Sequence, residues 1–183
     1  FNALTIGLGA LSLPLVFAYP FAKRITYWPQ IVLGLVFNWG ALVGWTAVEA
    51  TMAVPAVVLY AACIAWTVGY DTIYAHQDKA DDRQAGVRSS ALALGRATRP
   101  FLFAVYLVAW AGFAAAAWLA GLGWPAVAAL APAALHLLWQ AARVDLDRPA
   151  DCLAKFRANV DLGWLVAAGL VIALVLAGGS RAG

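Results

Sequence analysis

The chain has 183 residues, of which 64% are hydrophobic and only 11% are charged, and its mean hydropathy is +0.81. A soluble domain carries about 25% charged residues and has too little interior to bury this much apolar surface. A disordered chain is excluded by the same composition, because disorder requires low hydrophobicity. The net charge of +3 does not indicate a nucleic-acid partner, since the basic residues flank apolar runs, as they do in membrane proteins.

Six apolar segments are each long enough to cross a bilayer, which takes about 20 helical residues. The fifth contains Pro125 and Pro132, which membrane helices tolerate when neighbouring groups satisfy the freed carbonyl groups. The sequence therefore predicts an all-α, polytopic transmembrane helix bundle that forms a single membrane domain over residues 1–183. The expected spans lie near residues 2–19, 30–48, 53–75, 100–121, 124–142 and 161–179.

Basic residues alternate between the connections that join these spans. The connections after the first, third and fifth spans hold eleven of the twelve: Lys23, Arg24, Lys79, Arg83, Arg88, Arg96, Arg99, Arg143, Arg148, Lys155 and Arg157. The opposite connections, around 49–51 and 122–123, hold none, and Arg181 follows the last span. Because basic loops face the cytosol, we expect the first group to be cytosolic and Phe1 to lie on the other side.

The connection after the third span carries four carboxylates, at positions 71, 78, 81 and 82. If the third span continues as a helix to about residue 82, Asp71, Asp78 and Asp82 lie within about 20° of one line along it. Asp78 and Asp82 are then an i,i+4 pair that suits a hard divalent cation such as Mg²⁺. Asp71 falls within the span, where an ionisable group indicates function. The alternative interpretation is a solvated charge cluster at a helix end.

Residues 70–82, YDTIYAHQDKADD, followed by GVRS at 86–89, resemble the second aspartate motif of the UbiA prenyltransferase family. The match runs through Tyr70, Asp71, Thr72, Tyr74, Ala75, Asp78, Asp81, Asp82, Gly86, Arg88 and Ser89. A second segment, YPFAKRITYWPQ at 19–30, resembles the family's Y-x-x-x-K element through Tyr19 and Lys23, with Arg24 adjacent. Read without the resemblance, that segment is an interfacial tyrosine with snorkelling basic residues.

The resemblance implies Mg²⁺-dependent transfer of a polyprenyl group from polyprenyl diphosphate to the ring of 4-hydroxybenzoate in ubiquinone biosynthesis. It implies catalytic roles for Asp71, Asp78, Asp82 and Lys23, with Mg²⁺ on Asp78 and Asp82. It also implies that the substrates bind at Tyr19, Lys23, Arg24, Tyr74 and Arg88. The expected location is a bacterial inner membrane, or a mitochondrial one, with the active side cytosolic.

Members of this family are expected to have nine spans and a first aspartate motif between the second and third. The sequence contains no such motif, so we expect residues 1–183 to correspond to the C-terminal six spans and to be inactive alone. Three alternatives to the implied function stay open: prenyl transfer to another aromatic acceptor, an inactive fragment, and a multipass transporter.

Overall fold

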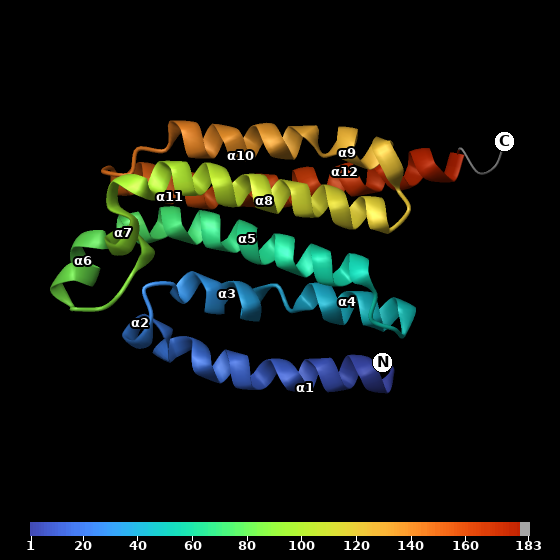
Figure 1. Ribbon diagram of the computed structural model, residues 1–183, viewed down its shortest axis with the longest axis horizontal. Coiled ribbons are helices and arrows are strands. Elements are labelled where there is room, and N and C mark those ends of the chain that lie inside the picture. Colours follow the sequence, from blue (N-terminus) through green and yellow to red (C-terminus); the bar gives the residue numbers. More distant parts are fainter. Residues whose placement is uncertain (180–183) are drawn as a thin grey trace.

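A computed structural model describes residues 1–179, and of Lys23 only the backbone, so the prediction for Arg181 lies outside the described residues. Within that range the chain is all helical (Figure 1). The elements are α1 Ala3–Ala18, η1 Tyr19–Phe21, α2 Ala22–Ile25, α3 Pro29–Phe37, α4 Gly40–Glu49, α5 Val54–Gln77, α6 Lys79–Gln84, α7 Ser90–Leu94, η2 Gly95–Ala97, α8 Thr98–Leu119, α9 Gly123–Ala129, α10 Ala131–Arg143, α11 Pro149–Arg157 and α12 Asn159–Gly179.

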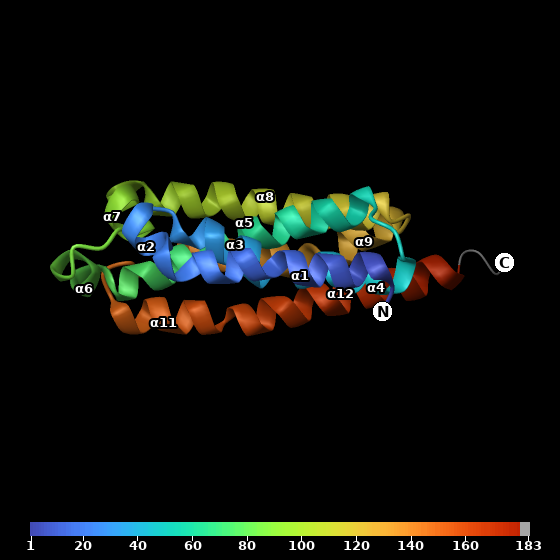
Figure 2. The same cartoon turned by 90° about the horizontal axis from the view of Figure 1, so that it is seen from below.

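Six helical stretches among the described residues are long and apolar enough to cross a membrane, which confirms the predicted all-α polytopic class. They are Ala3–Phe21, Pro29–Glu49, Val54–Gln77, Ser90–Leu119, Gly123–Arg143 and Pro149–Gly178. The fourth and sixth begin about ten residues before the apolar runs at 100 and 161, because the short helices α7 and α11 precede them. Figure 2 shows α11 and α12 following each other along one line. The apolar run therefore marks only part of each helical stretch.

Two of the spans are broken near their middle. In the second, α3 ends at Phe37 and α4 begins at Gly40. At the break, the Asn38 side-chain amide donates to the carbonyl oxygen of Gly34 at 2.9 Å and to the hydroxyl of Thr67 at 2.8 Å. The fifth span is broken at Leu130, between α9 and α10, directly before Pro132. Proline lacks the amide hydrogen that a continuous helix needs, so the break follows from the sequence.

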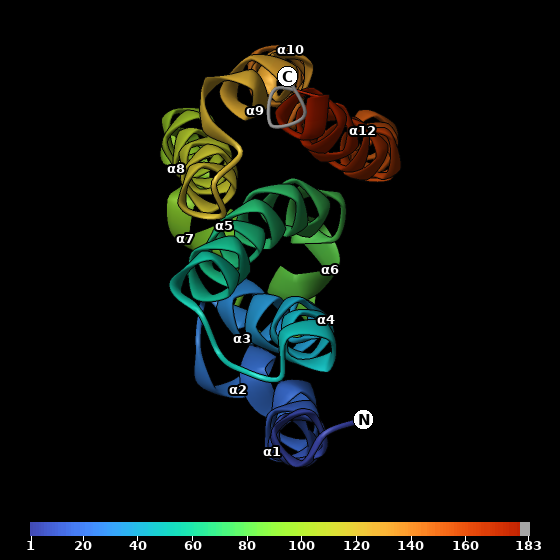
Figure 3. The same ribbon diagram turned by 90° about the vertical axis from the view of Figure 1, so that its right-hand side faces the viewer.

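Helix α5 lies at the centre of the bundle. The end-on view in Figure 3 shows α1 to α4 on one side of it and α8 to α12 on the other. Close packing against α8 depends on two glycines. A methyl group added at Gly112 would lie 2.6 Å from Cβ of Ala62, and one added at Gly69 would lie 2.2 Å from Cε1 of Tyr106. These glycines let two long helices approach closely, which is how membrane helices gain packing energy without a hydrophobic driving force.

A buried polar network joins four helices inside this packed half. Gln140 on α10 is fully buried and bonds to the hydroxyl of Tyr106 on α8 at 3.1 Å and to Asn159 on α12 at 3.2 Å. The indole of Trp66 on α5 donates to Asn159 at 2.7 Å. His136 contacts the Gln140 amide at 3.1 Å. In an apolar surrounding such groups must satisfy one another, so the network fixes how the four helices meet.

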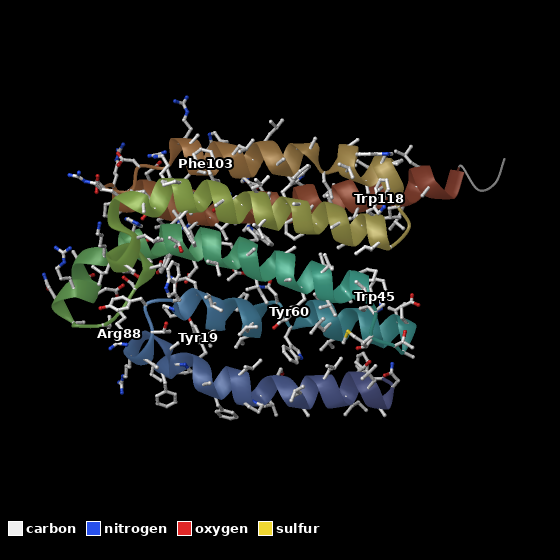
Figure 4. The ribbon with its side chains drawn as sticks, in the orientation of Figure 1. Tyr19, Trp45, Tyr60, Arg88, Phe103 and Trp118 are labelled. Carbon is white, nitrogen blue, oxygen red and sulfur yellow. The ribbon has the colours of Figure 1, made fainter. Side chains whose placement is uncertain are left out.

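The polar connections gather at one end of the bundle. In Figure 1, α2, α6, α7 and the connection from α10 to α11 lie at the left end, and the other connections lie at the right end with the N-terminus. Figure 4 shows Arg88 and Tyr19 at the first end and Trp45 and Trp118 towards the other. The alternation of basic residues along the sequence thus becomes one basic end, and its cytosolic orientation stays a prediction.

Candidate active site

Helix α5 carries the first carboxylate of the motif and stops at the second. It ends at Gln77, and Asp78 has the non-helical backbone angles φ −95° and ψ 5°. The chain then turns into the short helix α6, and the amide of Asp82 still donates to the carbonyl oxygen of Asp78 at 2.8 Å. The structure therefore differs from a helix that continues straight to residue 82. One turn of hydrogen bonding is kept, but the stripe of three carboxylates is bent at Asp78.

The two matched segments of sequence meet around one small cavity. It has a volume of about 110 Å³ and lies at the polar end of the bundle. Its lining includes Tyr19 from the first segment and Asp71, Tyr74 and Asp78 from the second, and also Pro29, Gln30, Ala75 and Ser89. Segments about fifty residues apart thus bring a phenol and two carboxylates into the same space. This convergence is the arrangement that the resemblance implies for Tyr19, Asp71 and Asp78.

Asp82 lies outside the residues that line this cavity, although its side chain is buried with 6% exposed. The bend at Asp78 turns α6 away from the axis of α5, and Asp82 is not among the residues that line the cavity with Asp78. Asp71 and Asp78 are the carboxylates that share the cavity. The assignment of Mg²⁺ to Asp78 and Asp82 stays a prediction, and the geometry favours Asp71 as the partner of Asp78.

The basic residues of the site differ in what they contact. Arg88 donates a hydrogen bond to the backbone carbonyl oxygen of Ile25, and its guanidinium carbon lies 5.4 Å from the centre of the Tyr27 ring. It therefore ties the loop before α7 to the end of α2. Arg24 is exposed on α2 at the same end. The predicted role of Lys23 concerns a side chain outside the described ones.

Tyr74 is half-buried, and its ring stands 4.7 Å, between centres, from Phe156 on α11. Tyr70 contacts the same phenylalanine ring at 5.6 Å. The packing of α11 over these rings holds one wall of the cavity. His76, next to the motif, is buried, and its Nε2 atom lies 3.0 Å from the hydroxyl of Thr98. This histidine is not among the residues that line the cavity.

Sequence reasoning missed two residues of the cavity, Gln30 and Ser89. Both are 1% exposed, and both line the cavity together with the carboxylates. The Gln30 amide nitrogen donates to the hydroxyl of Ser90 at 2.6 Å, and Ser90 donates to Thr72 at 3.2 Å. The signal was present, since Gln30 ends the first matched segment and Ser89 ends the second. Neither is charged, and an uncharged residue at a segment end gives no chemical reason to single it out.

The donor set of the cavity fits a hard cation. The described residues contain no group of three or more His, Cys, Asp or Glu side chains that would hold a metal ion by themselves. Mg²⁺ does not need such a group, because it typically takes one or two carboxylates and completes its shell with water and phosphate oxygens. Two carboxylates that share a cavity with polar uncharged side chains meet that requirement.

A sequence profile of the UbiA prenyltransferase family matches residues 1–166. The chain belongs to the UbiA prenyltransferase family. Relatives within it include the mitochondrial 4-hydroxybenzoate polyprenyltransferases of Caenorhabditis elegans, 46% identical, and Homo sapiens, 44% identical. The matches cover 96% and 93% of this chain but 49% and 46% of those proteins. The chain therefore spans about half the length of these relatives.

Among solved structures, this UbiA-family chain is similar to the apo form of a UbiA homologue from Aeropyrum pernix K1. The TM-score is 0.76 at 28% sequence identity, and the match covers 94% of this chain and 65% of that one. Fold and sequence thus lead to the same family. Membership of this prenyltransferase family gives no support to the alternative prediction of a multipass transporter.

Proposed function

We propose that this protein transfers a polyprenyl group from polyprenyl diphosphate to the ring of 4-hydroxybenzoate, a reaction of ubiquinone biosynthesis. Two observations support the proposal: relatives at 44–46% identity are named for this activity, and Tyr19, Asp71 and Asp78 converge on one cavity. The convergence supports the proposal most strongly, because a phenol and two carboxylates from separate segments line one cavity at the polar end of an apolar bundle. We propose a quinone-producing membrane, bacterial or mitochondrial, with this end facing the cytosol or the matrix.

Asp71 and Asp78 would hold Mg²⁺, and Asp82 would add negative charge one helical turn away. When bound, Mg²⁺ neutralises the charge that grows on the diphosphate oxygens as the carbon–oxygen bond breaks. Tyr19, which lines the same cavity, would donate its hydroxyl hydrogen to one of these oxygens. Lys23 and Arg24 follow Tyr19 by four and five positions and would supply positive charge to the leaving group.

The broken bond leaves an allylic cation, and its electron pair leaves with the diphosphate. The face of the Tyr74 ring would stabilise this cation by a cation–π interaction. The ring carbon of 4-hydroxybenzoate next to the hydroxyl group attacks the cation, a carbon–carbon bond forms, and the same ring carbon then loses its proton. Water must be kept away from the cation, and we propose that the Phe156 ring, packed against Tyr74, helps to exclude it.

The benzoate carboxylate needs a cationic partner outside the acidic cavity, because Asp71 and Asp78 would repel it. Arg24 and Arg88 both lie at this end of the bundle. Arg88 already binds the carbonyl oxygen of Ile25, so we propose Arg24 as the carboxylate partner and Arg88 as a residue that holds the loop. An arginine in this role binds carboxylate through two parallel hydrogen bonds.

The test uses a chimera in which this chain replaces the matching 176-residue region of the Caenorhabditis elegans relative. Membranes that contain the chimera receive a polyprenyl diphosphate, labelled 4-hydroxybenzoate and Mg²⁺. We expect labelled lipid that disappears when EDTA removes the metal and returns when Mg²⁺ is restored. The opposite outcome is a chimera that inserts normally, forms no labelled lipid with 4-hydroxybenzoate, and forms labelled lipid with another labelled aromatic acceptor. That result would contradict 4-hydroxybenzoate as the acceptor.

A further inference from the structure

Two neutral oxygen atoms at the acidic cavity have no hydrogen-bond partner. They are Oε1 of Gln30 and Oγ of Ser89, and each belongs to a side chain that is 1% exposed. Both residues line the cavity with Asp71 and Asp78. A buried polar atom without a partner is destabilising and uncommon, so such an atom beside a cavity indicates a ligand that completes it.

The surrounding contacts leave both oxygens without a local partner. The Gln30 amide nitrogen donates to Ser90, which donates in turn to Thr72 on α5, so the amide plane is fixed and its oxygen faces elsewhere. Ser89 occupies the N-cap position of α7, where a serine hydroxyl usually accepts a backbone hydrogen bond, but its side chain makes no such cap. Two buried oxygens beside the cavity are therefore left without their usual local partners.

Charge and size decide which ligand fits. The polar side chains that line the cavity are the carboxylates of Asp71 and Asp78, the amide of Gln30, and the hydroxyls of Ser89, Tyr19 and Tyr74, and none of them is cationic. Carboxylates repel an anion. The volume of about 110 Å³ is smaller than the ~150 Å³ cavity that holds a benzene ring, but it has room for a small cation and several waters at ~30 Å³ each. A hydrated divalent cation matches both properties.

We propose that Gln30 and Ser89 are positioning residues for the hydrated cation, and that they accept hydrogen bonds from its water shell while Asp71 and Asp78 bind the ion. The inference rests on the proposed function, which places a divalent cation at these carboxylates. It adds two uncharged residues from α3 and the start of α7. Partners of this kind orient a metal site, and their loss typically lowers metal affinity 10- to 100-fold.

The test measures binding of Mn²⁺ alone to purified residues 1–183 in lipid nanodiscs, by electron paramagnetic resonance of the free ion. We expect Gln30→Met to raise the dissociation constant roughly 10- to 100-fold and Ser89→Ala to raise it several-fold. Gln30→Glu should lower the dissociation constant, because a third carboxylate attracts the ion. This opposite sign distinguishes a role at the cation from a role in packing, which both Gln30 substitutions would disturb alike.

The matched control is Gln140→Met, which removes the other fully buried glutamine amide from the bundle, in the network with Tyr106 and Asn159. It should lower the unfolding temperature without changing the dissociation constant for Mn²⁺. Equal weakening by Gln140→Met and Gln30→Met would overturn the inference, since the effect would then come from general disturbance.

Asp78→Asn separates this inference from the proposed function. If Asp78→Asn weakens Mn²⁺ binding and the Gln30 and Ser89 variants stay within twofold of the unmodified chain, the inference is wrong and the metal site at the carboxylates stands. If the unmodified chain binds no Mn²⁺, or Asp78→Asn leaves binding unchanged, both the inference and the metal part of the proposed function fail.

Discussion

Arg88 donates a hydrogen bond to the backbone carbonyl oxygen of Ile25, 63 positions earlier in the chain. The contact joins the loop that follows the aspartate motif to the helix that follows Tyr19. Its guanidinium also lies over the ring of Tyr27. The two segments that line the cavity are thus held together by a side chain that is itself outside the cavity lining.

This contact predicts different kinetic effects for the two arginines at this end. In the chimera, Arg88→Met should lower kcat and leave the KM for 4-hydroxybenzoate within about twofold, because the loop loses its tie but the substrate loses no partner. Arg24→Met should raise that KM about tenfold or more, the scale of a lost charged hydrogen bond. Steady-state kinetics with varied 4-hydroxybenzoate separate the two. If only Arg88→Met raised this KM strongly, Arg88 would be the carboxylate partner and the proposed roles of the two arginines would be wrong.

The contact between Gly69 and Tyr106 predicts a large effect of a single methyl group. Gly69→Ala would place its Cβ 2.2 Å from a ring atom of a tyrosine that is 2% exposed and bonded to Gln140. The ring is buried and hydrogen-bonded, so it must shift together with its neighbours, and we expect a loss of about 1–3 kcal/mol in unfolding free energy, measured by denaturant titration in detergent. Gly44→Ala is the control, because nothing lies within 4 Å of its added methyl group. Equal stability of the two variants would show that α5 and α8 are not packed this closely.

The gathering of basic residues at one end predicts the topology. Reporter fusions after Arg24, Lys79 and Arg148 should all report the cytosolic side, and a fusion near Glu49 should report the opposite side. The four sites are at polar connections, so a fusion there interrupts no span. A cytosolic signal at Glu49 would contradict the order of the first three spans.

Much of the bundle could be predicted from the sequence, because the sequence patterns that specify it are strong and local. Six apolar runs, the basic connections and Pro132 account for the number of spans, the common polar end and the break before α10. Other features depend on partners that only the folded chain supplies. Arg99, for example, donates to the carbonyl oxygens of Ala141, Ala142 and Val144 at the end of α10. Sequence patterning assigns Arg99 only to the basic side.

The sequence could indicate which carboxylates gather near the acidic cavity, but it could not predict how they are arranged. Spacing places Asp71, Asp78 and Asp82 on one face only while the helix stays straight. The end of α5 at Gln77 moves Asp82 out of the cavity that holds the other two. Gln30 and Ser89 lie on other segments, and residue spacing along α5 gives no information about which residues from other segments join the cavity. A pocket formed by three separate elements is a tertiary property, and a linear motif specifies only the part that one helix carries.

The most direct test of the account compares Asp78→Asn with Asp161→Asn in the chimera, supplied with polyprenyl diphosphate, labelled 4-hydroxybenzoate and saturating Mg²⁺. Both changes remove one carboxylate charge, but only Asp78 lines the cavity, and Asp161 is exposed in the first turn of α12. We predict that Asp78→Asn lowers the rate of labelled lipid formation by roughly 10²-fold or more, and that Asp161→Asn keeps it within about twofold. Near-normal turnover by Asp78→Asn in a correctly inserted protein would contradict the assignment of this cavity as the active site.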